Sequence, residues 1–245
     1  MRANKENVVR RSTPAGKPRA RERVADEASY SFRAFLRAQA AGSDIRKGKR
    51  TEARIKWSTC ELLERTPLSA LKIQDVCSSA EIGQGTFYLY FPDRQALLNA
   101  VLLEYVGFIR ARMMDRSGVS KHYVDSVRWT TTVYYRLFEH NRGLMKCLIS
   151  YYEDFPEISK IASKMNRDWI EINVRSVKQR LKTQGRAGTI SEAELFRRCY
   201  ALGGMVDQYL SYIFLVADKN VIAISPSMED VVDTLSHIWV TVGAV

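Results

Sequence analysis

The stretch from Leu71 to Arg94, LKIQDVCSSAEIGQGTFYLYFPDR, constrains the fold of this chain more than any other. Its first part carries apolar residues at three- and four-residue spacing, namely Ile73, Val76 and Cys77, and this period predicts a short helix with one apolar face. The pattern stops at Glu81-Ile82-Gly83, where glycine tolerates backbone angles that other residues resist. A short helix and a tight turn are therefore expected here.

A second short helix is predicted over Gln84 to Tyr90. Phe91-Pro92 ends it, because proline disfavours helical geometry in the residue before it. Asp93 is suited to cap a third helix, with Arg94 in its first turn. Two short helices joined by a tight turn are the arrangement of a helix-turn-helix, whose second helix enters the major groove of DNA.

The second helix also has side chains that suit contact with DNA. Its small residues allow close approach, and its tyrosine hydroxyls and the following arginine suit phosphate contacts, which position a protein on DNA. The residues concerned are Gln84, Gly85, Thr86, Tyr88, Tyr90 and Arg94. A helical hairpin inside an all-helical bundle, with half-buried tyrosines, explains the same pattern, and the residues alone leave both interpretations open.

Over roughly residues 47 to 105, the sequence resembles the DNA-binding domain of the TetR family. The residues that carry the resemblance follow an opening helix from about Lys49 to Glu64, and they are Ile73-x-Asp75-Val76-Cys77, Gly85-Thr86-Phe87-Tyr88-x-Tyr90-Phe91, Arg94 and Leu97. The resemblance implies a helix-turn-helix DNA-binding domain over 45–95 and a helical ligand-binding and dimerisation domain over 96–245. It also implies a homodimer that reads a near-palindromic site in double-stranded DNA.

Basic and polar residues around the first helix add to the expected DNA contacts. Lys49 and Arg50 are placed to lie against the DNA backbone, and Thr51 is suited to cap the start of the helix. Lys72 stands where the family often has a hydroxyl residue that meets phosphate, and its charge suits the same contact. Glu81 stands where the family usually has glycine, and a positive φ there costs on the order of 1 kcal/mol.

The first 44 residues form a basic leader. Residues 1–50 hold 14 Lys/Arg against 5 Asp/Glu, whereas the formal charge of the whole chain is +11. Few large apolar residues occur before position 27, which predicts disorder, and the apolar period of Phe32, Phe35 and Leu36 allows a short helix within 28–41. An arm that contacts DNA and a solvated tail are both consistent with this composition. The leader lacks the apolar run of a secretory signal.

The rest of the chain has helical periods and no convincing alternating strand pattern, so the predicted class is all-α. Helices are expected over about Asp93–Asp115, His122–His140, Leu144–Glu153, from Pro156 to Leu181, after Ser191 to about Asp218, and from Ser227 to Val242. Ser191 and Ser227 each begin a capping-box pattern. The family resemblance implies that the last two of these helices form the dimer interface.

The 19-residue stretch Cys199 to Ala217 is the most apolar in the chain and approaches the length of a membrane span. Asp207, Gln208 and the pair Gly203-Gly204 argue against a span, so a core helix and no membrane role are expected. Two glycines inside a helix require a reason, such as close helix packing or space for a ligand.

The helices that enclose the effector pocket in the resembled family are rich in aromatic residues here, which suits a hydrophobic or aromatic small molecule. The candidate ligand-binding residues are Arg128, Trp129, Tyr135, Phe138, Trp169 and Asp207. Arg128 and Asp207 are charged groups in apolar surroundings and suit the orientation of a ligand. Ordinary core packing of the aromatic residues, and ion pairing of the two charged ones, are the alternatives.

Signals of catalysis are missing from the sequence. The three histidines are scattered, no phosphate-binding loop or nucleophile motif occurs, and the four cysteines have no CxxC pairing. We expect that the protein is not an enzyme and that it binds neither a metal nor a cofactor. The cysteine usage fits a reducing cytoplasm. A thiol redox sensor is a minor hypothesis.

The sequence therefore predicts a cytoplasmic, ligand-responsive regulator of transcription, and the resemblance to the family implies a repressor. The alternative is a DNA-bound protein whose C-terminal part binds a protein partner instead of a small molecule.

Overall fold

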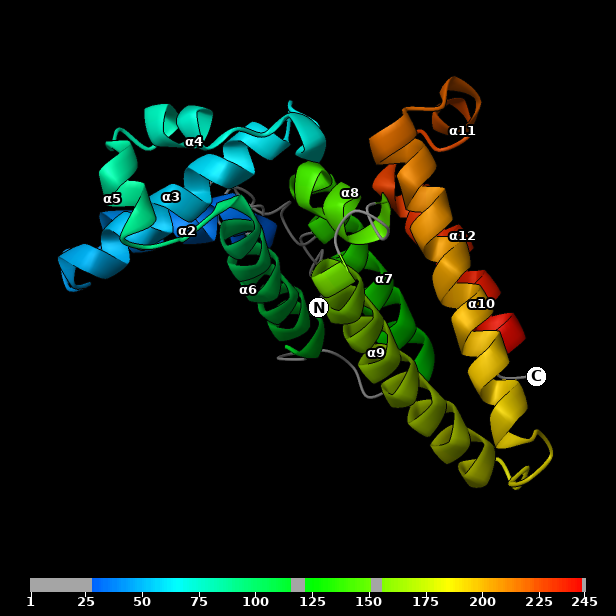
Figure 1. The fold of residues 1–245 in the computed structure, drawn as a ribbon. Coiled ribbons are helices and arrows are strands. Elements are labelled where there is room, and N and C mark those ends of the chain that lie inside the picture. The colour runs from blue at the N-terminus through cyan, green and yellow to red at the C-terminus, as the bar shows by residue number, and fades with distance from the viewer. Residues whose placement is uncertain (1–27, 116–121, 151–155, 244–245) are drawn as a thin grey trace, which may run out of the picture.

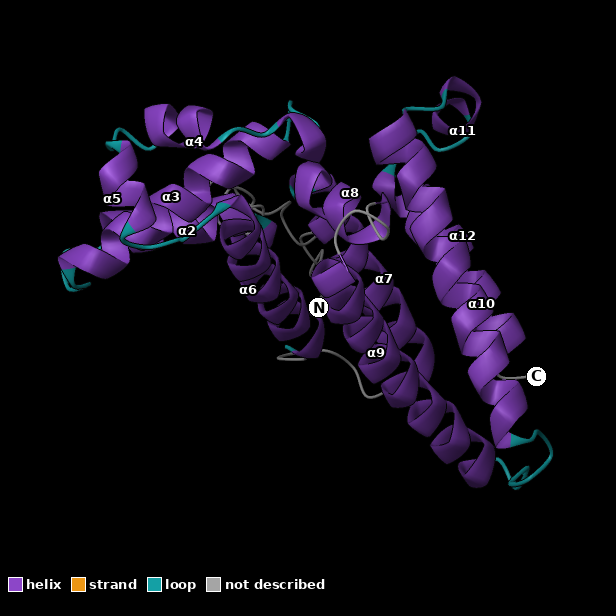
Figure 2. Cartoon of the chain, viewed as in Figure 1, coloured by secondary structure: helices purple, strands orange, loops and turns teal. Residues whose placement is uncertain are grey.

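A computed structural model of the chain describes residues 28–115, 122–150 and 156–243. Within these ranges every regular element is a helix, as Figure 2 shows, which confirms the all-α prediction. Most of the leader, residues 1–27, lies outside the described residues. Figure 1 shows a group of short helices at one end of α6 and a set of longer helices beside it.

The head comprises residues 28–91 and contains the predicted helix-turn-helix. Its elements are α2 (Phe32–Ala41), α3 (Lys47–Leu63), the 3₁₀ turn η1 (Leu68–Ala70), α4 (Ile73–Ser79) and α5 (Gln84–Tyr88). The helix α6 (Arg94–Met114) leads out of the head, and the Asp93 carboxylate caps it by accepting a hydrogen bond from the Ala96 amide at 2.7 Å. The predicted cap at Thr51 is wrong, because α3 begins at Lys47 and the Thr51 hydroxyl donates to the Lys47 carbonyl inside the helix.

The body comprises residues 122–150 and 156–243. It contains α7 (Tyr123–His140), α8 (Arg142–Ser150), α9 (Pro156–Thr183), α10 (Glu192–Ser211), the π-helical turn η2 (Tyr212–Val216), α11 (Lys219–Ala223) and α12 (Met228–Gly243). Ser191 and Ser227 accept hydrogen bonds from the amides three residues later, as their capping patterns predict. The helix predicted to run to Asp218 instead changes to η2 after Ser211, and Ala217 ends it at a φ of 54°.

The helix α2 joins the head to the body. Phe32 is fully buried, and its ring lies 5.3 Å from the rings of Tyr105 and Phe108 of α6. Its amide donates to the Asn141 side-chain oxygen at 2.8 Å, and the Asn141 amide group donates to the carbonyls of Tyr30 and Leu137. Asn141 is itself fully buried, so this one side chain satisfies backbone groups on both sides of the junction.

A second junction brings the end of α3 against the start of α8. Gly143 is buried there, and a Cβ added to it would lie 2.5 Å from the Leu63 carbonyl carbon and 2.9 Å from the Glu64 nitrogen. The neighbours are backbone atoms, which cannot rotate away as a flexible side chain can. Only glycine therefore permits this approach of the two helices.

We predict that Gly143→Ala lowers the free energy of unfolding by about 1–3 kcal/mol, because the added methyl group overpacks the contact between α3 and α8. Gly107→Ala is the matched control, since Gly107 is exposed within α6 and an added Cβ meets nothing within 4 Å. That variant should gain about 0.5–1 kcal/mol from the higher helix propensity of alanine. Urea unfolding measures both, and a Gly143→Ala protein as stable as the parent would contradict the close contact.

Candidate nucleic-acid interface and cavity

The turn between α4 and α5 holds the two helices at a fixed angle. The Ile82 amide donates to the Cys77 carbonyl at 3.0 Å, and Glu81 takes a φ of 52°. This is the left-handed region, which costs a residue with a Cβ on the order of 1 kcal/mol. Gly83 precedes α5 without a side-chain cap, at a φ of −73° that any residue adopts. The strained position of the turn is therefore Glu81 and not the glycine.

The apolar faces of α4 and α5 point inward and their polar faces point outward. Val76, Cys77 and Phe87 are buried, and the Phe87 ring lies 6.0 Å from the ring of Phe91. The outer face carries exposed residues that the sequence marked as candidate DNA contacts, namely Lys72, Gln84, Gly85 and Tyr88. Thr86 is half-buried beside them. The structure thus leaves these candidates on α4 and α5 accessible from outside the head.

Leu89 is a member of this surface that the sequence analysis missed. It caps the C-terminal end of α5 and is 84% exposed, the highest exposed fraction among the large apolar residues of the described chain. Single exposed apolar residues are common on folded proteins, so Leu89 is a candidate contact because it directly follows Tyr88 at the end of the candidate recognition helix. Its place between Tyr88 and Tyr90 within a short helix was the available signal.

Other candidates have partners inside the head. Arg94 donates from Nη1 to the Leu71 carbonyl at 3.0 Å and to the Ser69 carbonyl at 3.4 Å, which fixes η1 beside α6. Lys49 is exposed and pairs with Glu52 at 2.8 Å, whereas Arg50 and Tyr90 are half-buried. Arg94 therefore has a structural role in addition to any role at DNA.

A buried lysine links α3 to α6. Lys56 donates to Glu52 at 2.7 Å and to Glu104 at 2.8 Å. Burial alone lowers the pKa of Lys56, but the hydrogen bonds to Glu104 and Glu52 outweigh it, so this pKa lies above its usual value. Burial acts to raise the pKa of Glu52, yet the hydrogen bonds from Lys49 and Lys56 bring this pKa below its ordinary value. Lys56 and Glu52 are therefore both charged at neutral pH.

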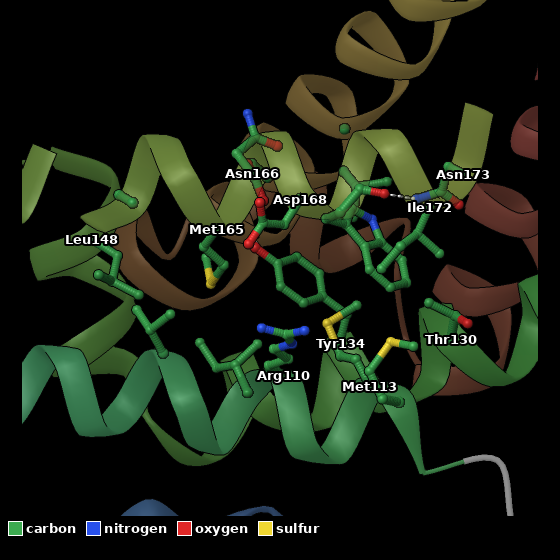
Figure 3. Close-up of a pocket in the computed structure, with 18 of the residues that line it drawn as sticks. Arg110, Met113, Thr130, Tyr134, Leu148, Met165, Asn166, Asp168, Ile172 and Asn173 are labelled. Atoms are coloured by element: carbon green, nitrogen blue, oxygen red, sulfur yellow. Dashed lines mark hydrogen bonds between the residues drawn. The ribbon is translucent and has the colours of Figure 1, made fainter. Parts of the chain in front are cut away.

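A cavity of about 480 Å³ lies between α6 and the body, and this volume falls within the usual size range of small-molecule sites. Its walls come from α6, α7, α8, α9 and α10, with Trp239 of α12. In Figure 3 the α9 residues Met165, Asn166 and Ile172 lie on one side of the cavity and Arg110 and Met113 of α6 on the other. Most of the lining side chains are apolar or aromatic, so the cavity suits an apolar molecule.

Two carboxylates line this cavity in different settings. Asp207 accepts a hydrogen bond from the Tyr134 hydroxyl at 2.6 Å, and burial raises the pKa of Asp207 although that bond acts in the opposite direction. Asp168 pairs with Lys164 at 2.9 Å, and the hydrogen bond from Lys164 lowers the pKa of Asp168. Arg110 is exposed and lines the cavity from α6.

Of the six candidate ligand-binding residues, the structure places two in the cavity wall, Trp169 and Asp207. Arg128 instead pairs with Glu229 at 3.5 Å and with Asp233, both on α12. Tyr135 and Phe138 pack their rings against Phe214, and Trp129 packs on the edge of the main core. The neighbouring residues Tyr134, Thr130 and Val127 face the cavity in their place.

The remaining chemistry of the described residues is sparse. No cluster of three or more His, Cys, Asp or Glu side chains that would suit a metal ion occurs in the part of the chain that the structure describes. The same part contains no helix with the length and hydropathy of a membrane span. All four thiols are buried, and burial raises the pKa of Cys199 to about 11 and that of Cys147 to about 12, which disfavours the reactive thiolate of a redox sensor.

Comparison with known proteins supports the interpretation of the head. Residues 58–101 match the family described as bacterial regulatory proteins, tetR family. The chain is 26% identical over 215 residues to the HTH-type transcriptional regulator EthR of Mycobacterium tuberculosis, covering 82% of this chain and 94% of that protein. It is 24% identical over 173 residues to the HTH-type transcriptional regulator YuxN of Bacillus subtilis, with coverage of 69% and 56%.

Solved structures share the fold at lower identity. A TetR-family regulator from Syntrophomonas wolfei superposes with a TM-score of 0.62 at 17% identity, covering 80% of this chain and 96% of that one. The regulator FadR of Bacillus subtilis, solved in complex with stearoyl-CoA, superposes with a TM-score of 0.58 at 12% identity, with coverage of 78% and 98%. The helix-turn-helix and the helical body are therefore arranged as in these regulators.

We predict that Asp207→Asn raises the free energy of unfolding at pH 7. Because folding raises the pKa of Asp207, the folded state binds the proton more tightly than the unfolded state does, and ionisation penalises the fold. The gain should appear as the pH rises above the ordinary value of 3.8 and reach its full size above the raised pKa. Asp168→Asn is the control, and it should lower the free energy of unfolding at pH 7, because folding lowers the pKa of Asp168. Chemical unfolding from pH 4.5 to 7.5 separates the two, and equal pH profiles for parent and Asp207→Asn would contradict the burial of this carboxylate.

Proposed function

Because the chain belongs to the TetR family of transcriptional regulators, we propose that it is a repressor that binds a near-palindromic operator as a homodimer and is released by an apolar small molecule. It is a regulator of transcription and not an enzyme. In this proposal residues 45–95 bind DNA, residues 96–245 hold the effector and form the dimer, and the protein acts in the cytoplasm.

The open face of α5 is the observation that carries the DNA-binding half of the proposal. Exposed Gln84 and Tyr88 suit base edges and phosphate, and exposed Leu89 suits the methyl group of thymine. Lys72 at the start of α4 adds a positive charge beside them. Two such heads in a dimer would meet successive major grooves, about 34 Å apart.

The helices α10 and α12 support a dimer. They pack against each other and run along the side of the body that lies away from α6 (Figure 1). Tyr200 is 44% exposed on α10, and Gly204 is exposed one turn further on, where an added Cβ meets nothing within 4 Å. A large aromatic ring beside a residue without a side chain suits close packing of a second copy.

The cavity supports release by a small molecule. The FadR structure was solved with stearoyl-CoA, which has a long apolar chain, and the apolar lining here suits a molecule of apolar character. Both α6 and α8 line the cavity and pack against α3 of the head. An effector that shifts either helix would change the position of the head, with a coupling of about 1–3 kcal/mol.

A second candidate function is the binding of a protein partner by the body. Three apolar residues near η2 and α11 favour it, since Val216 is 61%, Ile222 42% and Ile224 73% exposed. The cavity favours the small-molecule proposal, because a protein partner needs a surface and not an internal space.

Selection of bound sequences from a random DNA pool, with purified protein at 150 mM salt, tests the operator directly. One near-palindromic motif is the expected result, because a two-fold dimer presents two equal heads. Recovery of no shared motif by a folded dimer would contradict the proposal.

We predict that Leu89→Ala weakens binding to the selected DNA by about 1–3 kcal/mol, the usual range for a base contact. Val124→Ala is the matched control, because Val124 is an apolar residue of α7 that is 41% exposed and lies outside the head. Fluorescence anisotropy with labelled DNA gives both affinities. Unchanged binding by a folded Leu89→Ala protein would place α5 differently on the DNA.

A further inference from the structure

The cavity contains one acidic group whose charge the described residues do not balance. Asp207 lies on α10 among apolar lining residues, and it accepts a hydrogen bond at 2.6 Å from the Tyr134 hydroxyl. No ion pair within the described residues includes Asp207. A carboxylate accepts several hydrogen bonds through its two oxygens, so one neutral donor leaves most of this capacity open.

The other charged groups of the cavity behave differently. Asp168 and Lys164 both lie on α9 and neutralise each other at 2.9 Å. Arg110 is exposed on α6, where water screens its charge, and that charge acts to lower the pKa of Asp168. Among the charged lining residues, Lys164 and Arg110 both act on Asp168, whereas the negative charge of Asp207 has no cation partner within the described residues.

The charge of Asp207 affects which molecules bind well in the cavity. A charge-assisted hydrogen bond from a cation to a shielded carboxylate is roughly twice as strong as a neutral one. An anion placed at the same depth would lie beside Asp207 and be repelled. The apolar walls would contact the rest of the molecule, as they would for any effector of this size.

We propose that the cavity selects an effector with a protonated amine at one end of an apolar body, and that Asp207 receives the ammonium group. The inference rests on the proposed function, since it names the chemical class of the molecule that the cavity binds. It differs from the anionic ligand of the FadR structure, because the deep polar group here is a carboxylate.

Three probes of equal length test the proposal, namely 4-phenylbutylamine, 4-phenylbutan-1-ol and 4-phenylbutanoate. They share an apolar body and differ in the charge at one end. Isothermal titration calorimetry at pH 7 measures each with the parent protein, with Asp207→Asn and with Asp168→Asn. The last variant makes the same chemical change to a carboxylate of the same cavity that already has a cation partner.

The parent and Asp168→Asn should bind the amine about ten- to a hundredfold more tightly than the alcohol, with the acid weakest. Asp207→Asn should bring the preference for the amine down to about twofold, because the neutral amide keeps the shape and loses the charge. Tyr134→Phe removes the internal donor and should keep the preference, which separates the charge of Asp207 from its hydrogen bond.

Two results would overturn the inference and leave the proposed function standing. One is a preference for the acid or the alcohol in the parent protein, and the other is an amine preference that survives Asp207→Asn. If none of the three probes binds at millimolar concentration, the cavity is not a site for molecules of this kind, and the effector half of the proposed function fails with the inference. Operator binding, measured separately, is independent of that outcome.

Discussion

The close contact of α8 with the end of α3 joins the two parts of the molecule. Gly143 allows it, because backbone atoms of Leu63 and Glu64 occupy the space that a side chain would need. Packed interiors have little free space, so a contact between backbones transmits displacement more directly than a contact between flexible side chains. The position of the head relative to the body depends on this contact between α3 and α8.

Two further connections link the head to the body. The helix α6 begins at the head and continues into the body, and Lys56 of α3 holds Glu104 of α6 at 2.8 Å. Asn141 precedes α8 and binds the backbone of α2, whose Phe32 packs on α6. The helices α6 and α8 also form part of the cavity wall. A molecule in the cavity thus touches the same helices that set the orientation of the head, which is the physical basis for coupling between the two sites.

The sequence predicted the parts of this structure that depend on local chemistry. The helix-turn-helix follows from apolar spacing, a tight turn and Pro92, and the caps at Asp93 and Ser191 follow from hydrogen bonds within three residues. The strained position of Glu81 follows from a comparison with the glycine that the resembled family has there. Each of these features is decided within a few residues of the chain.

The cavity wall could not be predicted in the same way. Successive residues of a helix point about 100° apart, so Tyr134 faces the cavity while Tyr135 packs on Phe214. The apolar stripe of α7 is wide, and its period does not say which part of it lines a space and which part packs on α12. The charge of Arg128 in apolar surroundings suggested a ligand contact, but its partners Glu229 and Asp233 lie about a hundred residues later in the chain.

We infer that filling the cavity changes the affinity for DNA through α8. A tryptophan at position 149 tests it without any ligand, because Ile149 lines the cavity from α8. Ser150→Trp is the control, since Ser150 is exposed at the next position and does not line the cavity. We predict that Ile149→Trp weakens binding to the selected DNA by about 5- to 150-fold, whereas Ser150→Trp leaves it unchanged. A folded, dimeric Ile149→Trp protein that binds this DNA as tightly as the parent would contradict the coupling.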